Sequence, residues 1–306
     1  MALYNSTQEL IGNTPLVKLA NYGFPDGLNA YAKLELYNPS GSVKDRIGVS
    51  LIEKAERDGR LKPGGTIVAP TAGNTGLGIA FAALPKGYRV IFTIPDKFSA
   101  EKQALVRALG AEIVNTSRAG GMVETRAKAE EIRESIPGAI TLEQFTDQAN
   151  PEAHYLGTGP EIYRDLDGKI DYFVAGAGSG GTFSGVARYL KERIPGLVAV
   201  LADPVGSIIG GGNEHADYEI EGIGGEFIAD TMDVSLIDEV VKITDGDAFP
   251  AARALARKEG IFAGSSSGAA VAAAKIFAER SGAKGNLVVV LPDRGDRYFS
   301  KNLYPN

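Results

Sequence analysis

The stretch Asn38-Pro39-Ser40-Gly41-Ser42-Val43-Lys44-Asp45-Arg46 joins a turn, marked by Pro39 and Gly41, to the start of an amphipathic segment. The apolar residues of that segment share one face of a helix: Ile47, Leu51, Ile52 and Ala55. Lys44 therefore lies where a loop enters a helix that ends at Gly59. A helix start disfavours an ammonium group, so burial there would lower the pKa of Lys44. Such an amine can form a Schiff base, whereas an isolated surface lysine would simply be solvated.

The composition is ordinary for a globular protein, with 306 residues, 44% hydrophobic, 23% charged and a net charge of −6. This length allows two lobes or one large α/β domain. The mild acidity argues against nucleic acid or an anionic membrane as a partner. Residues 1–12 lack the regions of an export signal, and the most apolar stretch, 269–278, is too short to cross a bilayer. We therefore expect a cytoplasmic protein.

Two rare residue types limit the chemistry. The chain has no cysteine, and its two histidines are His154 and His215. The absence of cysteine excludes disulfides, thiolate nucleophiles and thiolate metal sites. With two histidines we expect neither a serine–histidine triad nor a polyhistidine metal site. Carboxylate metal sites stay open, but we predict no metal ligands.

Apolar runs of strand length alternate with helical patterns along the chain. We predict strands at 66–69, 88–94, 112–115, 139–142, 170–175, 197–202, 240–243 and 287–291. We predict helices, besides the one that begins at Lys44, at 76–83, 99–109, 123–135, 151–166, 183–193, 247–258 and 267–281. This alternation indicates an α/β fold in which helices cover both faces of parallel sheets.

Four turns rich in glycine or serine each lie between a strand and a helix. They are 70–76 (Pro-Thr-Ala-Gly-Asn-Thr-Gly), 176–182 (Gly-Ala-Gly-Ser-Gly-Gly-Thr), 222–226 (Gly-Ile-Gly-Gly-Glu) and 264–268 (Gly-Ser-Ser-Ser-Gly). Ligands of open α/β sheets bind at the carboxyl ends of the strands. Free N–H groups at helix starts bind anions, so the first turn suits a carboxylate and the second a phosphate. Any one of them alone could be only a capped turn.

The second turn also fits the dinucleotide-binding pattern G-x-G-x-x-G. Gly176, Gly178 and Gly181 occupy the glycine positions, and Asp203 follows about 20 residues later, at the end of the next predicted strand. A nicotinamide or flavin oxidoreductase is therefore a competing interpretation, although it gives no role to Lys44.

Taken in this order, the stretches resemble the fold-type II enzymes that use pyridoxal 5'-phosphate, and most closely the cysteine synthase and cystathionine β-synthase family. The resemblance runs from 11–16 to 292–298. It implies a two-lobed, three-layer αβα fold with parallel-rich sheets, similar to tryptophan synthase β. We place the division near residue 148 from the chain length. Residues 39–148 would form a smaller mobile domain, and residues 1–38 and 149–306 a larger domain that holds the cofactor. The resemblance further implies a homodimer and the docking of a serine acetyltransferase.

The resemblance implies a role for each cofactor-binding residue. Lys44 looks like the lysine that forms the internal aldimine. Asn74 is similar to the asparagine that bonds the phenolic oxygen of the cofactor, and Ser266 is similar to the serine that faces the pyridine nitrogen. The phosphate cup is implied at Gly178, Ser179, Gly180, Gly181 and Thr182.

The substrate-binding residues follow from the same resemblance. Those that resemble the grip on the substrate carboxylate are Thr71, Ala72, Gly73 and Thr75, with Gln144. The loop at Gly222 resembles one that closes over the bound substrate. Two positions depart from the family: Ala72 stands where many members have serine, and Glu226 where many sulfide-using members have a small or neutral residue. A carboxylate at Glu226 could bind the amino group of a second amino acid such as homocysteine, or act as a base.

The implied reaction is β-replacement on O-acetyl-L-serine or L-serine. Lys44 would remove the α-proton, loss of the leaving group would give an aminoacrylate, and sulfide or homocysteine would add to it. The products would be L-cysteine or L-cystathionine. Two alternatives share the fold: a cysteine lyase that releases hydrogen sulfide, and a serine or threonine deaminase. All of them act on small amino acids.

Overall fold

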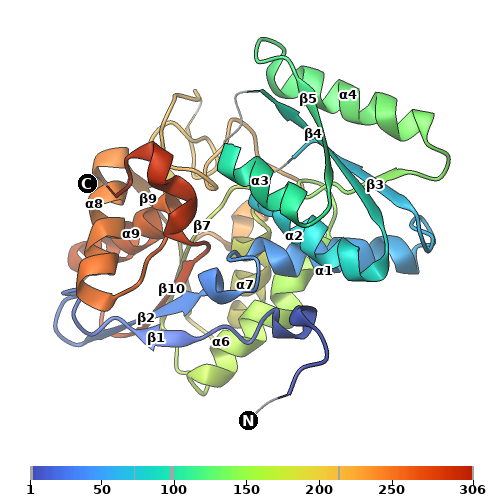
Figure 1. Cartoon of the computed structure of the whole chain (residues 1–306). Helices are drawn as coiled ribbons and strands as arrows, with labels where there is room; N and C mark the ends of the chain where they lie inside the picture. The colour runs from blue at the N-terminus through green and yellow to red at the C-terminus, as the bar shows by residue number, and fades with distance from the viewer. Residues whose placement is uncertain (1–2, 72, 97–99, 213, 305–306) are drawn as a thin grey trace.

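The structure is a computed structural model of the 306-residue chain and describes residues 3–71, 73–96, 100–212 and 214–304. Its strands form two sheets, with the orders β1-β2-β10-β7-β8-β9 and β5-β4-β3-β6. In Figure 1 the six-stranded sheet lies with α6–α9 at the lower left, and the four-stranded sheet lies with α1–α4 at the upper right. The predicted α/β fold with parallel-rich sheets is confirmed.

The six-stranded sheet carries the larger hydrophobic core. Its strands are β1 (Leu16–Lys18), β2 (Leu28–Leu34), β7 (Tyr172–Gly176), β8 (Val198–Pro204), β9 (Glu239–Ile243) and β10 (Gly285–Leu291). All neighbours are parallel except β1 and β2. Alternate residues of β7 enter different cores: Val174 packs with α8 (Asp245–Glu259) and α9 (Ser265–Ser281), and Phe173 packs with α6 (Gly159–Asp165) and α7 (Gly181–Lys191). Helices therefore cover both faces, as a buried parallel sheet requires.

The four-stranded sheet is wholly parallel. Its strands are β3 (Thr66–Ala69), β4 (Arg89–Pro95), β5 (Glu112–Thr116) and β6 (Ile140–Thr141). One face packs against α1 (Lys44–Arg57), α2 (Asn74–Ala83) and α3 (Ala100–Ala108), and the other packs against α4 (Gly121–Ser135). Residue 99, where we predicted the start of α3, lies outside the described residues.

Short helices connect these elements. The 3₁₀ segments are Thr7–Leu10, Glu35–Tyr37, Leu84–Lys86, Val234–Leu236 and Gly295–Lys301. The predicted helix 151–166 is interrupted: α5 (Ala149–Ala153) runs into a π-helical turn, His154–Thr158, which runs into α6. None of the helices in the described ranges is both long and apolar enough to cross a membrane.

Strand β2 was missed because its sequence mixes polar with apolar residues. Lys33 is the middle one of the last three residues of β2, all of which are buried, and its own side chain is fully buried. Its ammonium donates to the backbone oxygen of Thr14 at 2.7 Å and pairs with Glu161 at 2.8 Å. A buried charge is tolerated only with such partners, and neither partner can be read from the local pattern.

Two glycines bring the helices that carry the predicted site into contact. A Cβ on Gly48 of α1 would lie 2.3 Å from the backbone oxygen of Gly78 in α2, and a Cβ on Gly78 would lie 2.4 Å from that of Lys44. No side chain fits such spacing. The crossing therefore fixes the start of α1, at Lys44, beside the helix that begins at Asn74.

Candidate functional site

A cavity of about 580 Å³ lies where the carboxyl ends of β3, β7 and β10 meet the starts of α1, α2, α7 and α9. All four predicted turns contribute to its wall. Its lining includes Lys44, Thr71, Gly73, Asn74, Thr75, Gln144, Gly178, Ser179, Gly180, Thr182, Gly222, Glu226 and Ser266. Segments distant in sequence thus form one site, at the sheet edge where α/β folds bind ligands.

Lys44 is the first residue of α1, and its side chain lines the cavity. Desolvation by the surrounding protein lowers its pKa to about 8, while the negative charge of Asp293 acts in the opposite direction. The turn before it is tied to the end of β10, because the N–H of Val43 donates to the oxygen of Pro292 at 2.8 Å. The predicted lowering of the pKa is therefore found, and burial is its main cause.

Asn74 begins α2 and belongs to a polar cluster at the cavity wall. Its Nδ2 donates to Oδ2 of Asp293 at 2.7 Å, and its Oδ1 accepts from Arg297. Arg297 also donates to the backbone oxygen of Ser40, in the turn before Lys44. Tyr298 donates to the same carboxylate oxygen of Asp293, and burial raises the pKa of this tyrosine. These contacts fix the Asn74 amide in one orientation.

Sequence reasoning missed Asp293 and Tyr298 as members of the site, although both line the cavity. The only signal was the 292–298 motif at the far end of the chain, which carried the resemblance without a role for either residue. Backbone contacts hold Asp293 in place. It forms an isolated antiparallel β-bridge with Ser42, and its backbone oxygen accepts a hydrogen bond from the N–H of Gly264 at 3.0 Å. It therefore connects the lysine turn with the serine turn.

The glycine-rich turn after β7 approaches other backbone too closely for side chains. A Cβ on Gly178 would lie 2.7 Å from the oxygen of Gly222, and one on Gly180, where φ is +82°, would lie 2.4 Å from Met232. Gly181 begins α7 and packs against Asn150, so it supports the turn and does not line the cavity. The free N–H groups of this helix start form an anion-binding surface.

Ser266 lies in the first turn of α9, is almost fully buried, and lines the cavity. A Cβ on Gly222 would lie 3.8 Å from its hydroxyl, so the Gly222 loop passes directly beside it. The neighbouring Ser265 accepts a hydrogen bond from the N–H of Glu221 at 3.0 Å. The serine turn therefore carries both a polar group for a ligand and an anchor for the loop.

The predicted carboxylate-binding residues lie at or next to the start of α2, together with Gln144. Thr71 and Gly73 line the cavity at the start of α2, and Thr75 donates its hydroxyl to Oε1 of Gln144 at 2.7 Å. Ala72 lies outside the described residues. The Thr75 bond orients the Gln144 amide, so its NH₂ group remains as a donor.

Glu226, His215 and Glu221 also line the cavity, and the exposed Glu226 and His215 lie where it opens to solvent. The loop that bears Glu226 is anchored at its base: the N–H of Gly224 donates to Ala177 at 2.7 Å, and that of Gly225 donates to Ser207 at 3.1 Å. Asp203, the acidic residue of the dinucleotide pattern, is fully buried and binds Lys242 and the N–H of Gly210. It holds the long loop after β8, so a ligand role for it is not supported.

Comparison with known proteins agrees with this geometry. The family model described as pyridoxal-phosphate dependent enzyme matches residues 7–293. The O-acetylserine dependent cystathionine beta-synthase of Bacillus subtilis (strain 168) is 48% identical over 304 residues, which is 99% of each chain. The cysteine synthase of Staphylococcus aureus (strain N315) is 45% identical over 301 residues, 98% of this chain and 96% of that protein. The structure of a hydrogen sulfide-producing enzyme from Fusobacterium nucleatum matches with a TM-score of 0.91 and 38% identity, over 97% of this chain and 100% of that one.

Proposed function

The chain belongs to the family of pyridoxal-phosphate dependent enzymes, and from this premise we propose that it catalyses β-replacement on O-acetyl-L-serine or L-serine with sulfide or homocysteine as the nucleophile. The product is L-cysteine or L-cystathionine. One observation carries the proposal: Lys44, whose pKa burial lowers to about 8, lines the same cavity as the glycine-rich turn before α7 and the start of α2. Its substrates are small amino acids.

The residues present fit pyridoxal 5'-phosphate. Lys44 offers a free amine for the aldehyde, and Asn74 a fixed amide for the phenolic oxygen. Gly178, Ser179, Gly180 and Thr182 line the cavity at the start of α7, where the free backbone N–H groups and the two hydroxyls suit a phosphate group. When bound, the cofactor withdraws electrons from an amino-acid substrate and so makes its α-proton acidic. Ser266, which lines the same cavity, would offer the ring nitrogen a hydroxyl, a group that cannot hold that nitrogen protonated as a carboxylate would.

The protein's own groups bind and orient the substrate. The N–H groups at Gly73 and Thr75 and the amide of Gln144 bind its carboxylate, since a helix start favours an anion. A substrate held there would share the cavity with the amine of Lys44. The lysine amine, largely neutral above pH 8, then takes the α-proton. Because a serine hydroxyl would leave the ring less electron-poor than a carboxylate would, Ser266 would favour loss of the β leaving group over transamination.

Glu226 determines the nucleophile in this proposal. Its carboxylate lies at the mouth, where a second amino acid such as homocysteine would place its ammonium group. The same carboxylate could activate water, which would turn the enzyme into a cysteine lyase that releases hydrogen sulfide. The relative from Fusobacterium nucleatum, a hydrogen sulfide-producing enzyme, supports keeping this second candidate.

The proposal extends to movement, assembly and location. Residues 39–148, which contain the four-stranded sheet and α1–α4, would move as the smaller domain against residues 1–38 and 149–306. We place the enzyme in the cytoplasm as a homodimer that can dock a serine acetyltransferase. These statements are supported by the family resemblance, and gel filtration with and without that partner tests the assembly.

Two measurements test the proposed function. Borohydride reduction of the purified protein should attach the cofactor permanently to Lys44, and a peptide digest should find the label there. A product assay should then offer O-acetylserine, serine or cysteine, each with sulfide, homocysteine or neither. A label on another lysine, or full turnover by Lys44→Ala, would refute the mechanism. Accumulation of pyruvate alone would indicate the deaminase instead.

A further inference from the structure

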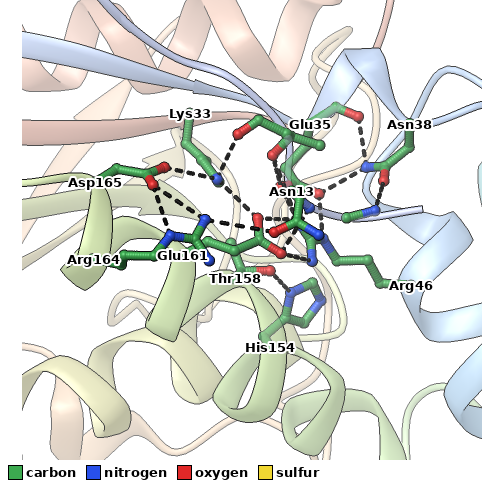
Figure 2. Close-up of polar contacts among 12 residues, drawn as sticks. Asn13, Lys33, Glu35, Asn38, Arg46, His154, Thr158, Glu161, Arg164 and Asp165 are labelled. Carbon is green, nitrogen blue, oxygen red and sulfur yellow. Dashed lines mark hydrogen bonds and ion pairs between the residues drawn. The ribbon is translucent and has the colours of Figure 1, made fainter. Parts of the chain in front are cut away.

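His154 is a fully buried histidine that no step of the proposed mechanism uses. It begins the π-helical turn His154–Thr158, between α5 and α6. Such turns are rare and recur at functional sites. Figure 2 shows the imidazole beside Thr158, below the group of charged side chains that includes Glu35, Arg46 and Glu161.

Both ring nitrogens of His154 face hydroxyl groups. Nδ1 lies 2.9 Å from Oγ1 of Thr158, and Nε2 lies 3.1 Å from Oγ1 of Thr182. Thr182 belongs to the glycine-rich turn and lines the cavity. The imidazole therefore stands directly behind the proposed phosphate site and contacts one of its hydroxyls.

The surroundings keep this imidazole neutral. Burial and the positive charge of Arg46 lower the pKa of His154 to about 3. Arg46 is itself held between two carboxylates, with distances of 2.7 Å to Glu35 and 2.7 Å to Glu161. A neutral imidazole carries one N–H, so one of its two hydrogen bonds donates and the other accepts.

The two tautomers have different consequences for the cavity. With the proton on Nδ1, Nε2 accepts from Thr182, and the single hydroxyl proton of Thr182 points away from any anion. With the proton on Nε2, the histidine donates to Thr182, whose own proton is then free to bind an anion. Thr158 supplies the remaining bond by donating to Nδ1.

A second buried group, the Asn150 amide, donates a hydrogen bond to the other hydroxyl of the glycine-rich turn, that of Ser179. The side chain of Asn150, in α5, is fully buried, and its Nδ2 donates to Oγ of Ser179 at 2.9 Å. Ser179 also lines the cavity and keeps its proton for a ligand. The segment from α5 into the π-helical turn thus places nitrogen groups behind both hydroxyls of the turn.

We propose that His154 is held as the Nε2–H tautomer and that it is a positioning residue, which orients the Thr182 hydroxyl to donate to the phosphate of the cofactor. This proposal rests on the proposed function for the identity of the anion. The proposal also gives the π-helical turn a role. The turn directs Nε2 of His154 toward Thr182 and places Nδ1 beside the hydroxyl of Thr158.

The tautomer can be measured directly. Long-range ¹H–¹⁵N NMR of the histidine-labelled holoenzyme reports which ring nitrogen carries the proton, and a His215→Gln variant assigns the two rings. We expect a protonated Nε2 and a bare Nδ1 that stay unchanged as the pH is lowered from about 8 to about 6, since a pKa near 3 lies far below this range. A protonated Nδ1, or an imidazolium, would overturn the proposal.

Cofactor affinity tests the role of the tautomer. Thr182→Val removes a hydrogen bond to a charged group, so we expect it to weaken pyridoxal 5'-phosphate binding about tenfold or more. Thr182→Ser should bind within about threefold of the parent, because the hydroxyl remains. His154→Gln can keep a donor near the Nε2 position, whereas His154→Asn is too short, so the latter should resemble Thr182→Val. Equal affinities for all four variants would contradict the proposal.

The two proposals fail separately. A borohydride label at Lys44 together with a protonated Nδ1 would leave the function intact and remove the role of His154. An absent label would remove the function, whichever tautomer is found. Should the His154 variants fail to fold, the tautomer of the unsubstituted protein and the Thr182 pair still decide the question.

Discussion

At the residue scale, the protonation of Lys44 governs the chemistry. Because its pKa is lowered to about 8, its amine is neutral where exposed lysines are still ammonium ions. We predict that formaldehyde and cyanoborohydride methylate Lys44 of the cofactor-free protein ahead of other lysines. The rate of methylation of Lys44 should rise with pH up to about 8 and level off above it.

Peptide mass mapping over the pH series measures these rates, with the exposed Lys62 as the internal control. Parallel rates for the two lysines would disprove the lowered pKa.

Glu226 is the residue that we expect to separate the two nucleophiles. Removing its carboxylate in Glu226→Ala takes away the partner for the ammonium group of homocysteine, while sulfide has no such group. An exposed ion pair is worth up to about 1 kcal/mol, so kcat/KM for homocysteine should fall about fivefold and that for sulfide should hardly change.

Two variants control for the Glu226 prediction. Glu226→Asp keeps the charge and should keep most of the preference for homocysteine. Glu219→Ala removes an exposed carboxylate from the same long loop, outside the cavity lining, and should change neither rate. If Glu226→Ala slows both nucleophiles equally, the carboxylate is not an acceptor site, and its role as a base for water becomes the better explanation.

At the scale of elements, the crossing of α1 and α2 fixes the distance between Lys44 and Asn74. Gly48→Ala would place a methyl group 2.3 Å from the backbone oxygen of Gly78, so the helices must separate. Overpacking of this kind costs about 1–3 kcal/mol. We predict a lower midpoint of urea unfolding. We also predict weaker binding of the cofactor, which its absorbance measures. Gly246→Ala, in the first turn of α8, meets only Oγ1 of Thr244 at 3.5 Å and should leave the midpoint unchanged or raise it.

The elements also show how far the sequence alone could lead. The turns at 70–76 and 176–182 were predictable because strand, glycines and helix follow each other within a few residues. The turn at 264–268 lies between α8 and α9, and its signal was the run of glycine and serine before a helix. All three turns line the cavity. The π-helical turn at His154–Thr158 was not, because its extra residue is stabilised by distant partners: Arg46 lies against Gly157, and Thr182 against His154. The hydrophobic periodicity of a local stretch does not report contacts with residues that are distant in sequence.

At the scale of the whole molecule, a buried group of charges ties together segments far apart in sequence. Glu161 of α6 pairs with Lys33 of β2 at 2.8 Å and with Arg46 of α1 at 2.7 Å (Figure 2). Arg46 also pairs with Glu35, directly after β2. The group therefore connects the helix of Lys44 to the six-stranded sheet, and its loss would loosen the support of the site.

Glu161→Gln is the variant that measures this connection. The neighbouring positive charges lower the pKa of Glu161 from 4.5 to about 2, although burial alone would raise it. A group whose folded pKa is lowered stabilises the protein above its unfolded pKa and loses that effect as the pH falls through its folded pKa. The contribution should therefore be complete above about pH 4.5 and fade toward pH 2, with a size of about 3 kcal/mol from the pKa difference.

We accordingly expect Glu161→Gln to lower the free energy of unfolding by several kcal/mol at pH 7, because two buried cations lose a partner. Between about pH 4.5 and pH 2 the difference from the parent should shrink, since the parent loses the same charge. Urea titrations across this range measure both effects. Glu112→Gln, which breaks the exposed pair with Arg89, should cost no more than about 1 kcal/mol at any pH. If the two variants behave alike, the buried group does not hold the two sheets together, and the position of Lys44 must depend on the helix crossing alone.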